Sequence, residues 1–183
     1  MLGWIVNRFM EFITQTAGQP TTDKISEMTS LNNDAIIKND TSYPDYKWQA
    51  LIFAAIEETG LAKDELERKF AEYFFDRIIE DFGAFFKKSN DAFDFITNLI
   101  HLYRTLEVSS STTEVDKFAL FANLRHKIII RYKSPTLMCD FVRRIIELSF
   151  NHYHEENYSI TETICAKEGS PYCEFIIEKI HYG

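Results

Sequence analysis

Residues 132–175 read YKSPTLMCDFVRRIIELSFNHYHEENYSITETICAKEGSPYCEF and decide the fold of this chain. A break at Ser134-Pro135 follows a predicted strand over 127–133, and apolar residues then recur with the spacing of an amphipathic helix. The patterns of 158–166 and of 172–180 predict two further strands. The stretch therefore predicts a helix packed on an antiparallel sheet.

All three cysteines of the chain, Cys139, Cys165 and Cys173, fall in this stretch. The residues Gly169-Ser170-Pro171 predict a turn between the last two strands, which brings Cys165 and Cys173 together across a hairpin. Cys139, on the first turn of the helix, would complete the group. An odd number of cysteines without a secretion signal disfavours a disulfide framework and leaves metal ligation, redox chemistry or packing as alternatives.

The residues before this stretch predict a mainly helical half, followed by one strand pair. Residues 19–42 are polar and predict a connection with one short helix near 23–31. The remaining predicted elements are helices over 2–17, 45–60, 63–80 and 91–106 and strands over 118–121 and 127–132.

The fold class that follows is α/β in the α+β arrangement: a helical N-terminal half packed on a C-terminal half that has a roughly four-stranded antiparallel sheet and a covering helix. With 183 residues, of which 45% are hydrophobic, the chain is long enough for one substantial core. We therefore expect a single domain over 1–183, with a helical part over 1–108 and a sheet-containing part over 114–183.

Charge and hydropathy exclude several classes of function. The net charge of −8, without a basic cluster, argues against nucleic-acid binding. No basic leader and no apolar run of spanning length is present, so we expect a cytoplasmic protein without membrane insertion. No nucleophile–base pair and no paired acid and base stand at a recognisable spacing, so the sequence predicts no enzyme.

The order of several short motifs along nearly the whole chain resembles the haem-nitric oxide/oxygen-binding (H-NOX) sensor family. The resemblance implies an α/β sensor with haem between its two halves. The motif residues are Met1, Gly3 and Ile5; Tyr43 and Asp45; Phe70, Tyr73 and Phe74; Phe95, Ile96, Leu99 and Leu102; and Tyr132 and Ser134. The haem pocket that the resemblance implies consists of Ile5, Phe9, Phe74, Leu99, Leu102, Tyr103, Tyr132, Ser134 and Phe141.

The chain departs from the family at three positions that seat haem. Tyr103 stands at the axial histidine, Thr136 at the arginine that clamps the propionates, and Asp116 near a proline that packs under the porphyrin. A neutral tyrosine is a poor iron ligand, although Arg104 could lower its pKa. His101 lies two residues earlier, about 200° around the helix. These departures predict a domain that is degenerate for haem.

The resemblance also implies a metal site, because some bacterial members carry zinc in the C-terminal half. Transferred to this chain, its ligands are Cys139, Cys165 and Cys173, with Glu162 in place of a histidine. Glu162 and Cys165 are three residues apart and would face opposite sides of a regular strand, so a bulge or strand end is required. The alternatives are buried thiols, a reversible Cys165–Cys173 disulfide, or His152 or His154 as the fourth ligand.

The sequence thus predicts a stand-alone H-NOX-like sensor domain that is degenerate for haem and acts as a zinc-thiolate, redox-responsive regulator of a partner. By resemblance, the partner is a signalling protein in trans, such as a histidine kinase or a cyclic-di-nucleotide enzyme. One alternative is a haem-binding NO/O2 gas sensor with Tyr103 as the axial ligand. The other is a binder of an apolar small molecule in the former haem pocket.

Overall fold

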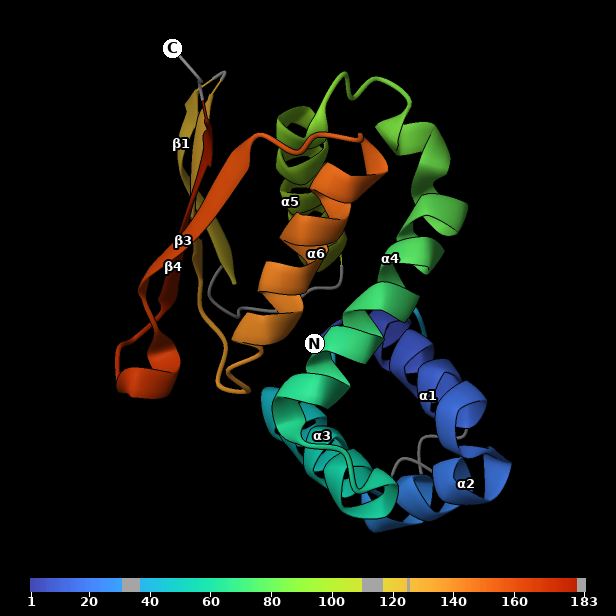
Figure 1. Ribbon diagram of the computed structural model, residues 1–183. Coiled ribbons are helices and arrows are strands. Elements are labelled where there is room, and N and C mark those ends of the chain that lie inside the picture. The colour runs from blue at the N-terminus through green and yellow to red at the C-terminus, as the bar shows by residue number, and fades with distance from the viewer. Residues whose placement is uncertain (31–36, 110–116, 125, 181–183) are drawn as a thin grey trace.

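The computed structural model describes residues 1–30, 37–109, 117–124 and 126–180. Figure 1 shows helices α1 to α4 on one side of the molecule and the sheet on the other, with α5 and α6 between. The helices are α1 (Gly3–Ala17), α2 (Gln19–Met28), α3 (Asp45–Thr59), α4 (Lys63–Phe86), α5 (Ala92–Ser109) and α6 (Cys139–His152). The strands are β1 (Phe118–Leu124), β2 (Lys127–Tyr132), β3 (Tyr158–Ile164) and β4 (Cys173–Lys179).

The first four helices follow the predicted elements, with two differences in their bounds. Gly18 directly follows α1 and Gly60 directly follows α3, and both have the positive φ that glycine adopts readily after a helix. α2 begins at Gln19, earlier than the predicted residue 23, because Pro20 fits the first turn of a helix. α4 continues to Phe86, beyond the predicted residue 80, and buries Phe86 against Phe95.

The sheet is antiparallel throughout, in the strand order β1-β2-β4-β3. Residues of β2 alternate between half-buried and buried, and the buried side chains Ile128, Ile130 and Tyr132 lie in the core. Figure 1 shows α5 and α6 beside the sheet, and α5 contacts both β1 and α6. The predicted fold class is therefore confirmed.

Aromatic side chains join the helical part to α6. Phe70 and Phe74 of α4 lie 5.4 Å apart between ring centroids, and each ring packs on Phe141 of α6, at 5.2 Å and 5.4 Å. Phe9 of α1 packs edge-on against Phe70 at 4.9 Å. The core is thus continuous from α1 through α4 to α6.

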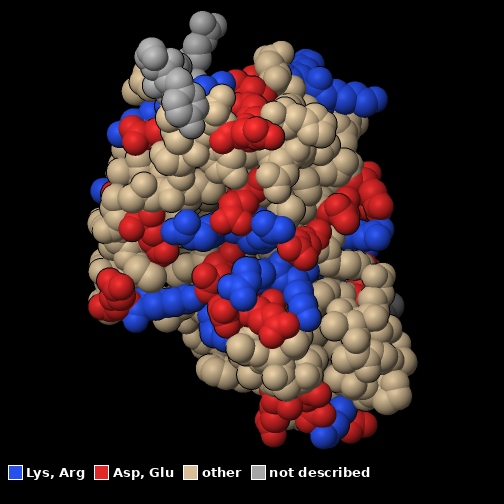
Figure 2. Space-filling model, in the orientation of Figure 1, with Lys and Arg blue, Asp and Glu red and all other residues tan. Residues whose placement is uncertain are grey.

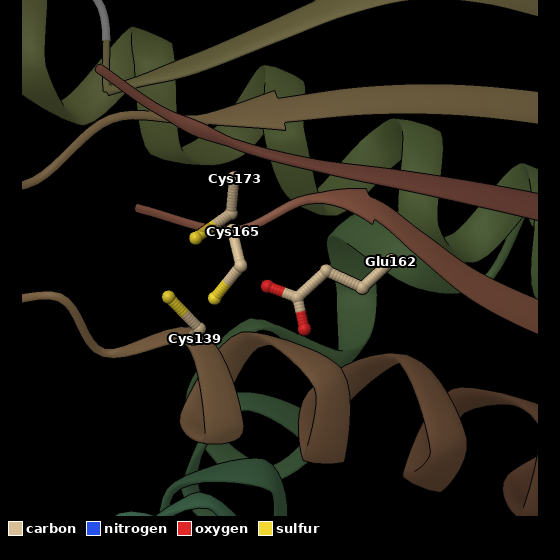
Figure 3. A group of neighbouring side chains, drawn as sticks. All are labelled: Cys139, Glu162, Cys165 and Cys173. Atoms are coloured by element: carbon tan, nitrogen blue, oxygen red, sulfur yellow. The ribbon is translucent and has the colours of Figure 1, made fainter. Parts of the chain in front are cut away.

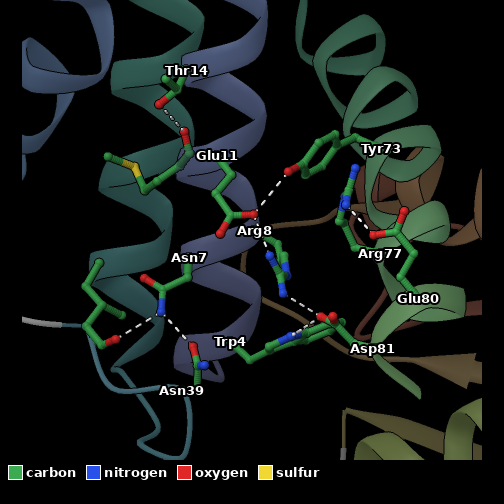
Figure 4. Close-up of polar contacts among 12 residues, drawn as sticks. Trp4, Asn7, Arg8, Glu11, Thr14, Asn39, Tyr73, Arg77, Glu80 and Asp81 are labelled. Atoms are coloured by element: carbon green, nitrogen blue, oxygen red, sulfur yellow. Dashed lines mark hydrogen bonds and ion pairs between the residues drawn. The ribbon is translucent and has the colours of Figure 1, made fainter. Parts of the chain in front are cut away.

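Polar contacts hold α1 against α4 at the edge of this core (Figure 4). The Arg8 guanidinium pairs with Glu11 at 2.6 Å and with Asp81 at 2.5 Å. The Trp4 indole donates to Asp81, and the Tyr73 hydroxyl donates to Glu11. Two helices distant in sequence are therefore fixed by a network as well as by packing.

The visible surface alternates in charge. Figure 2 shows basic side chains interspersed with acidic ones across the middle of the molecule, instead of a continuous basic patch. Typical pairs are Arg144 with Glu72 and Lys167 with Asp140. Within the described part of the chain, no helix has both the length and the apolar character that crossing a membrane requires.

Candidate functional site

A cluster of three thiols and one carboxylate lies where the first turn of α6 meets the β3–β4 hairpin (Figure 3). Cys139 is the first residue of α6, Cys173 is the first residue of β4, and Cys165 directly follows β3. Glu162 projects from β3. One ligand atom from each of the four residues lies within 4.8 Å of the others. The structure thus brings together all four residues that the sequence proposed as metal ligands.

A strand irregularity explains how Glu162 and Cys165 reach the same point. The register of β3 against β4 shifts between Glu162 and Ile164, and the strand ends at Ile164. These are the bulge and the strand end that the spacing required. The chain then turns through residues 166–168 to Gly169, whose φ of 91° is in the left-handed region. This turn returns the backbone so that the Ala166 amide donates to the Cys173 sulfur at 3.3 Å.

The thiols influence each other's ionisation. The hydrogen bond that Cys139 donates to Cys173, together with burial, raises the pKa of the Cys139 thiol. The same hydrogen bond, with the Ala166 amide, lowers the pKa of Cys173 because both stabilise a thiolate there. Burial and the neighbouring Glu162 raise the pKa of Cys165, which is half-buried. The Cys173 thiol therefore loses its proton more readily than an ordinary cysteine, and the Cys139 and Cys165 thiols lose theirs less readily.

The Glu162 carboxylate presents an unused ligand atom. Its Oε1 is buried without a hydrogen-bond partner, whereas Oε2 lies 3.7 Å from an Arg143 nitrogen. A tetrahedral zinc ion with Zn–S bonds of about 2.3 Å holds its ligand atoms roughly 3.5–3.8 Å apart, so closure needs shifts of about 1 Å or less. Three thiols and a carboxylate are an accepted donor set for zinc. The residues present therefore fit this metal.

The other candidates for the cysteine region are placed differently. His152, in the last turn of α6, packs against Phe75 and Phe95. His154 follows the helix, and both lie about 20 Å from Cys139 along the helix axis. Neither can be the fourth ligand that the sequence left open. All three cysteines are free thiols in the structure, and no Cys165–Cys173 disulfide is formed.

A second site is an apolar cavity of about 110 Å³ between α1, α4, α5, α6 and the sheet. Drug-sized ligands occupy pockets of roughly 300–1,000 Å³, whereas a dry cavity of about 150 Å³ holds benzene or xenon. The cavity is therefore of a size for a very small apolar molecule. Its lining is Met1, Leu2, Trp4, Ile5, Trp48, Phe70, Phe74, Ile78, Ile96, Leu99, Ile100, Leu102, Tyr103, Leu106, Lys117, Phe118, Ile130, Tyr132, Met138, Phe141, Val142, Ile145 and Ile146.

Two of the predicted pocket residues do not line this cavity. Phe9 is fully buried against Trp48 and Phe70, behind the cavity wall. The Ser134 hydroxyl is hydrogen-bonded to Thr136 instead. The structure places the remaining predicted residues on the lining: Ile5, Phe74, Leu99, Leu102, Tyr103, Tyr132 and Phe141.

The polar side chains of Tyr132, Ser134 and Thr136, near the cavity, form hydrogen bonds with one another. Ser134 and Thr136 lie 2.7 Å apart between hydroxyl oxygens, and both hydrogen-bond to the buried Tyr132 phenol. Burial raises the pKa of Tyr132, so this phenol stays neutral. No arginine and no histidine stands among the described residues of the lining. This set offers neither an imidazole ligand nor a guanidinium for the propionates, and the Tyr103 phenol lines the cavity where the family resemblance places the axial histidine.

The residues considered for haem iron are placed as follows. Tyr103 is half-buried and packs edge-on against Phe118 at 5.1 Å. His101 is exposed, as its helix position predicts. The Arg104 guanidinium donates to the Phe118 carbonyl at 2.8 Å. Asp116 lies outside the described residues.

Sequence reasoning missed two buried charged residues. Lys117 is 4% exposed, contacts the Asp45 carboxylate and lines the cavity. The sequence around Lys117, a single lysine before a strand, has no pattern that would predict its burial. Glu67 is 1% exposed, and its signal was available, since it lies on the apolar face of α4 beside Leu66 and Phe70.

These features define the class of protein: an α+β fold in which helices and an antiparallel sheet enclose an apolar cavity. The sequence pattern of the haem-NO-binding family matches residues 2–162. The chain therefore belongs to this family, the H-NOX sensors, and the resemblance drawn from its motifs is confirmed. A comparison with curated proteins finds no match.

Solved structures share the fold over their whole length. An H-NOX protein from K. algicida, in the Fe(II) unliganded form, is 19% identical with a TM-score of 0.77, and the match covers 100% of this chain and 98% of that one. An H-NOX protein from S. oneidensis in the Fe(II)NO ligation state is 18% identical with a TM-score of 0.73, covering 99% and 100%. At these identities the likeness shows the fold alone.

Proposed function

We propose that this chain is a signalling sensor of the H-NOX family in which Cys139, Glu162, Cys165 and Cys173 bind zinc and respond to oxidants. The observation that supports this most directly is the buried Oε1 of Glu162, which has no hydrogen-bond partner and lies in a group of three thiols. Most buried polar atoms in proteins have a hydrogen-bond partner. A metal ion supplies the missing partner.

Charge around the cluster supports the same proposal. Three thiolates, one carboxylate and Zn²⁺ together carry a charge of about −2. Arg143 lies beside Glu162, and Lys167 pairs with Asp140, next in sequence to Cys139. Two cations therefore stand close to the excess negative charge.

An oxidant would convert this centre between two states. Hydrogen peroxide would take two electrons from two of the thiolates, which would form one disulfide; with two protons from solvent its oxygens would leave as two water molecules, and the site would lose its zinc ion. Cys165 is the most exposed of the three cysteines and is the expected first point of attack. Loss of zinc would remove the metal link between α6 and the hairpin and leave ion pairs such as that of Lys167 with Asp140. The surface presented to a partner then changes.

The partner we propose is a signalling protein in trans, such as a histidine kinase or a cyclic-di-nucleotide enzyme. Membership of a sensor family supports this proposal. A regulator without enzymatic activity of its own needs such a partner for its output. We further propose a cytoplasmic location and no nucleic-acid binding, in keeping with the charge of −8.

Metal analysis of the purified protein tests the zinc proposal. We expect about one zinc per chain by elemental analysis, lost in Cys173→Ser and weakened in Glu162→Gln. Glu178→Gln is the matched control, because Glu178 lies on β4 and pairs with Lys127 away from the cluster. A metal-free wild-type protein with full stability, which does not bind added zinc, would refute the proposal.

The apolar cavity supports a second candidate function, the binding of a small apolar molecule in the place of haem. Its lining is almost wholly hydrocarbon, and its 110 Å³ suits a ligand of benzene size or smaller. We expect benzene or xenon to raise the melting temperature of the wild-type protein. Val142→Trp, which fills the cavity, should abolish that shift. No shift in the wild type would contradict this function.

A further inference from the structure

We infer that Glu67 of α4 is a positioning residue for the metal centre: it holds the first turn of α6 and thereby aims Cys139 at the hairpin cysteines. This inference rests on the proposed zinc site and concerns its regulation. It makes metal occupancy depend on the contact between the helical part and α6.

The first turn of α6 lacks a cap of its own. Its N-cap residue is Met138, and no side chain of the N-cap position makes a capping hydrogen bond. The first amides of a helix need acceptors, which an N-cap side chain normally provides. Here the acceptor comes from another helix. Glu67 Oε2 accepts the amides of Asp140 at 3.1 Å and of Phe141 at 3.2 Å.

The Glu67 carboxylate is itself held in place. Its side chain is fully buried, and its other oxygen contacts the Lys63 ammonium one turn earlier in α4. Lys63 also donates to the Leu137 carbonyl at 3.0 Å. Leu137 has a φ of 51°, in the left-handed region that leucine rarely adopts. Glu67 and Lys63 together therefore fix the backbone on both sides of Met138.

Cys139 stands inside this restrained segment. Before it, Leu137 contacts Lys63 and Met138 contacts Trp48. After it, the backbone amides of Asp140 and Phe141 donate to Glu67. From the opposite side, Lys167 of the hairpin contacts the Asp140 carboxylate. The backbone on both sides of Cys139 is thus held by contacts that none of the four ligands supplies.

Phe141 connects the proposed metal centre to the apolar cavity. It is bound by Glu67 through its amide, while its ring lines the cavity and stacks on Phe70. Because Phe141 joins the turn at Cys139 to the cavity wall, a displacement of that turn on metal release would reach the Phe70 ring of α4, and filling of the cavity would reach Cys139. Linkage requires that the effect be reciprocal.

Zinc competition with a chelator tests the inference. Glu67→Gln keeps the size of the side chain but removes the charge that binds Lys63 and both amides. Loss of such an orienting partner typically lowers metal affinity about 10–100-fold, and we expect a decrease in this range. The control is Glu72→Gln, which removes another α4–α6 contact, the exposed pair with Arg144, and should leave zinc affinity unchanged.

A second readout does not depend on metal. In metal-free protein, the amide hydrogens of Asp140 and Phe141 should exchange with solvent about tenfold faster in the Glu67→Gln variant than in the Glu72→Gln variant. The Cys139 thiol should also be alkylated faster in the Glu67→Gln variant. If Glu67→Gln does not fold, Lys63→Gln should show the same changes to a smaller degree. Folded Glu67→Gln with unchanged zinc affinity and exchange would overturn the inference. If the wild type binds no zinc, the zinc proposal fails, and the exchange rates still decide the role of Glu67.

Discussion

The Trp48 indole Nε1 donates a hydrogen bond to the Met138 sulfur at 3.2 Å. Trp48 lies in α3 and Met138 directly precedes α6, and both are almost completely buried. A buried indole N–H needs an acceptor, and here the thioether is its partner. This bond attaches the helical part to the residue that precedes Cys139.

Met138→Leu should therefore cost more stability than its change in shape explains. An isosteric apolar exchange costs less than about 1.5 kcal/mol, whereas a buried donor without a partner costs about 1–3 kcal/mol more. We expect a total loss of about 2 kcal/mol or more in urea unfolding. Met10→Leu, at a partly buried position of α1, is the control and should cost less than about 1 kcal/mol. Equal effects of both substitutions would show that the hydrogen bond contributes nothing.

Gly3 provides a test of the contact between α1 and the segment that precedes α3. A Cβ at this position would lie 2.0 Å from the Lys38 carbonyl oxygen and 3.0 Å from the Tyr43 ring. The Gly3 amide also donates to the Thr41 carbonyl at 2.8 Å, so the two backbones cannot separate without loss. Gly3→Ala should destabilise the protein by about 1–3 kcal/mol, as overpacking does.

Gly83→Ala is the matched control for that substitution. Gly83 lies within α4, and a Cβ there meets no atom within 4 Å. Alanine has the better helix propensity, so this variant should gain about 0.5–1 kcal/mol. The two glycine-to-alanine variants thus have opposite predicted signs in one unfolding assay. A loss in both would mean that the α1 contact has no special role.

Much of this architecture could be predicted from local patterns in the sequence. The apolar spacing of α6 and the turn at Gly169 each depend on residues close in sequence, and the structure agrees with them. The cysteine cluster was predictable for a related reason. A hairpin turn brings Cys165 and Cys173 together whatever the rest of the chain does.

The parts that could not be predicted depend on contacts between distant residues. The partner of Glu67 lies 73 residues away at Asp140, and no periodicity encodes that pairing. The cavity volume is set by how rings such as Phe70 and Phe141 pack together, which composition does not determine. Phe9 illustrates this limit. It shares the apolar face of α1 with Ile5, yet only Ile5 lines the cavity.

Zinc affinity should depend steeply on pH. The pKa of the Cys139 thiol is raised by its hydrogen bond to Cys173 and by burial. This thiol is therefore protonated at neutral pH, and zinc must displace the proton in order to bind. Affinity therefore falls as pH falls, by about tenfold per pH unit for each proton released. Competition with a chelator between about pH 6 and about pH 8 should give a slope of at least one. A flat profile would indicate that carboxylates, and not thiols, dominate binding.

Tyr103→His, alone and together with Thr136→Arg, tests whether the missing imidazole and guanidinium, and not the cavity volume of about 110 Å³, prevent haem binding. Tyr103 lines the cavity, and a neutral phenol is a weak iron ligand, so the wild type should show little Soret absorbance after expression with added haem. Tyr103→His supplies an imidazole from the same helix position, and adding Thr136→Arg supplies a guanidinium beside Tyr132 and Ser134 for the propionates. We expect the band to grow in that order. Tyr46→His, on the exposed face of α3, controls for adventitious ligation and should leave the spectrum unchanged. A stoichiometric band in the wild type, lost in Tyr103→Phe, would establish the tyrosine-ligated gas sensor instead.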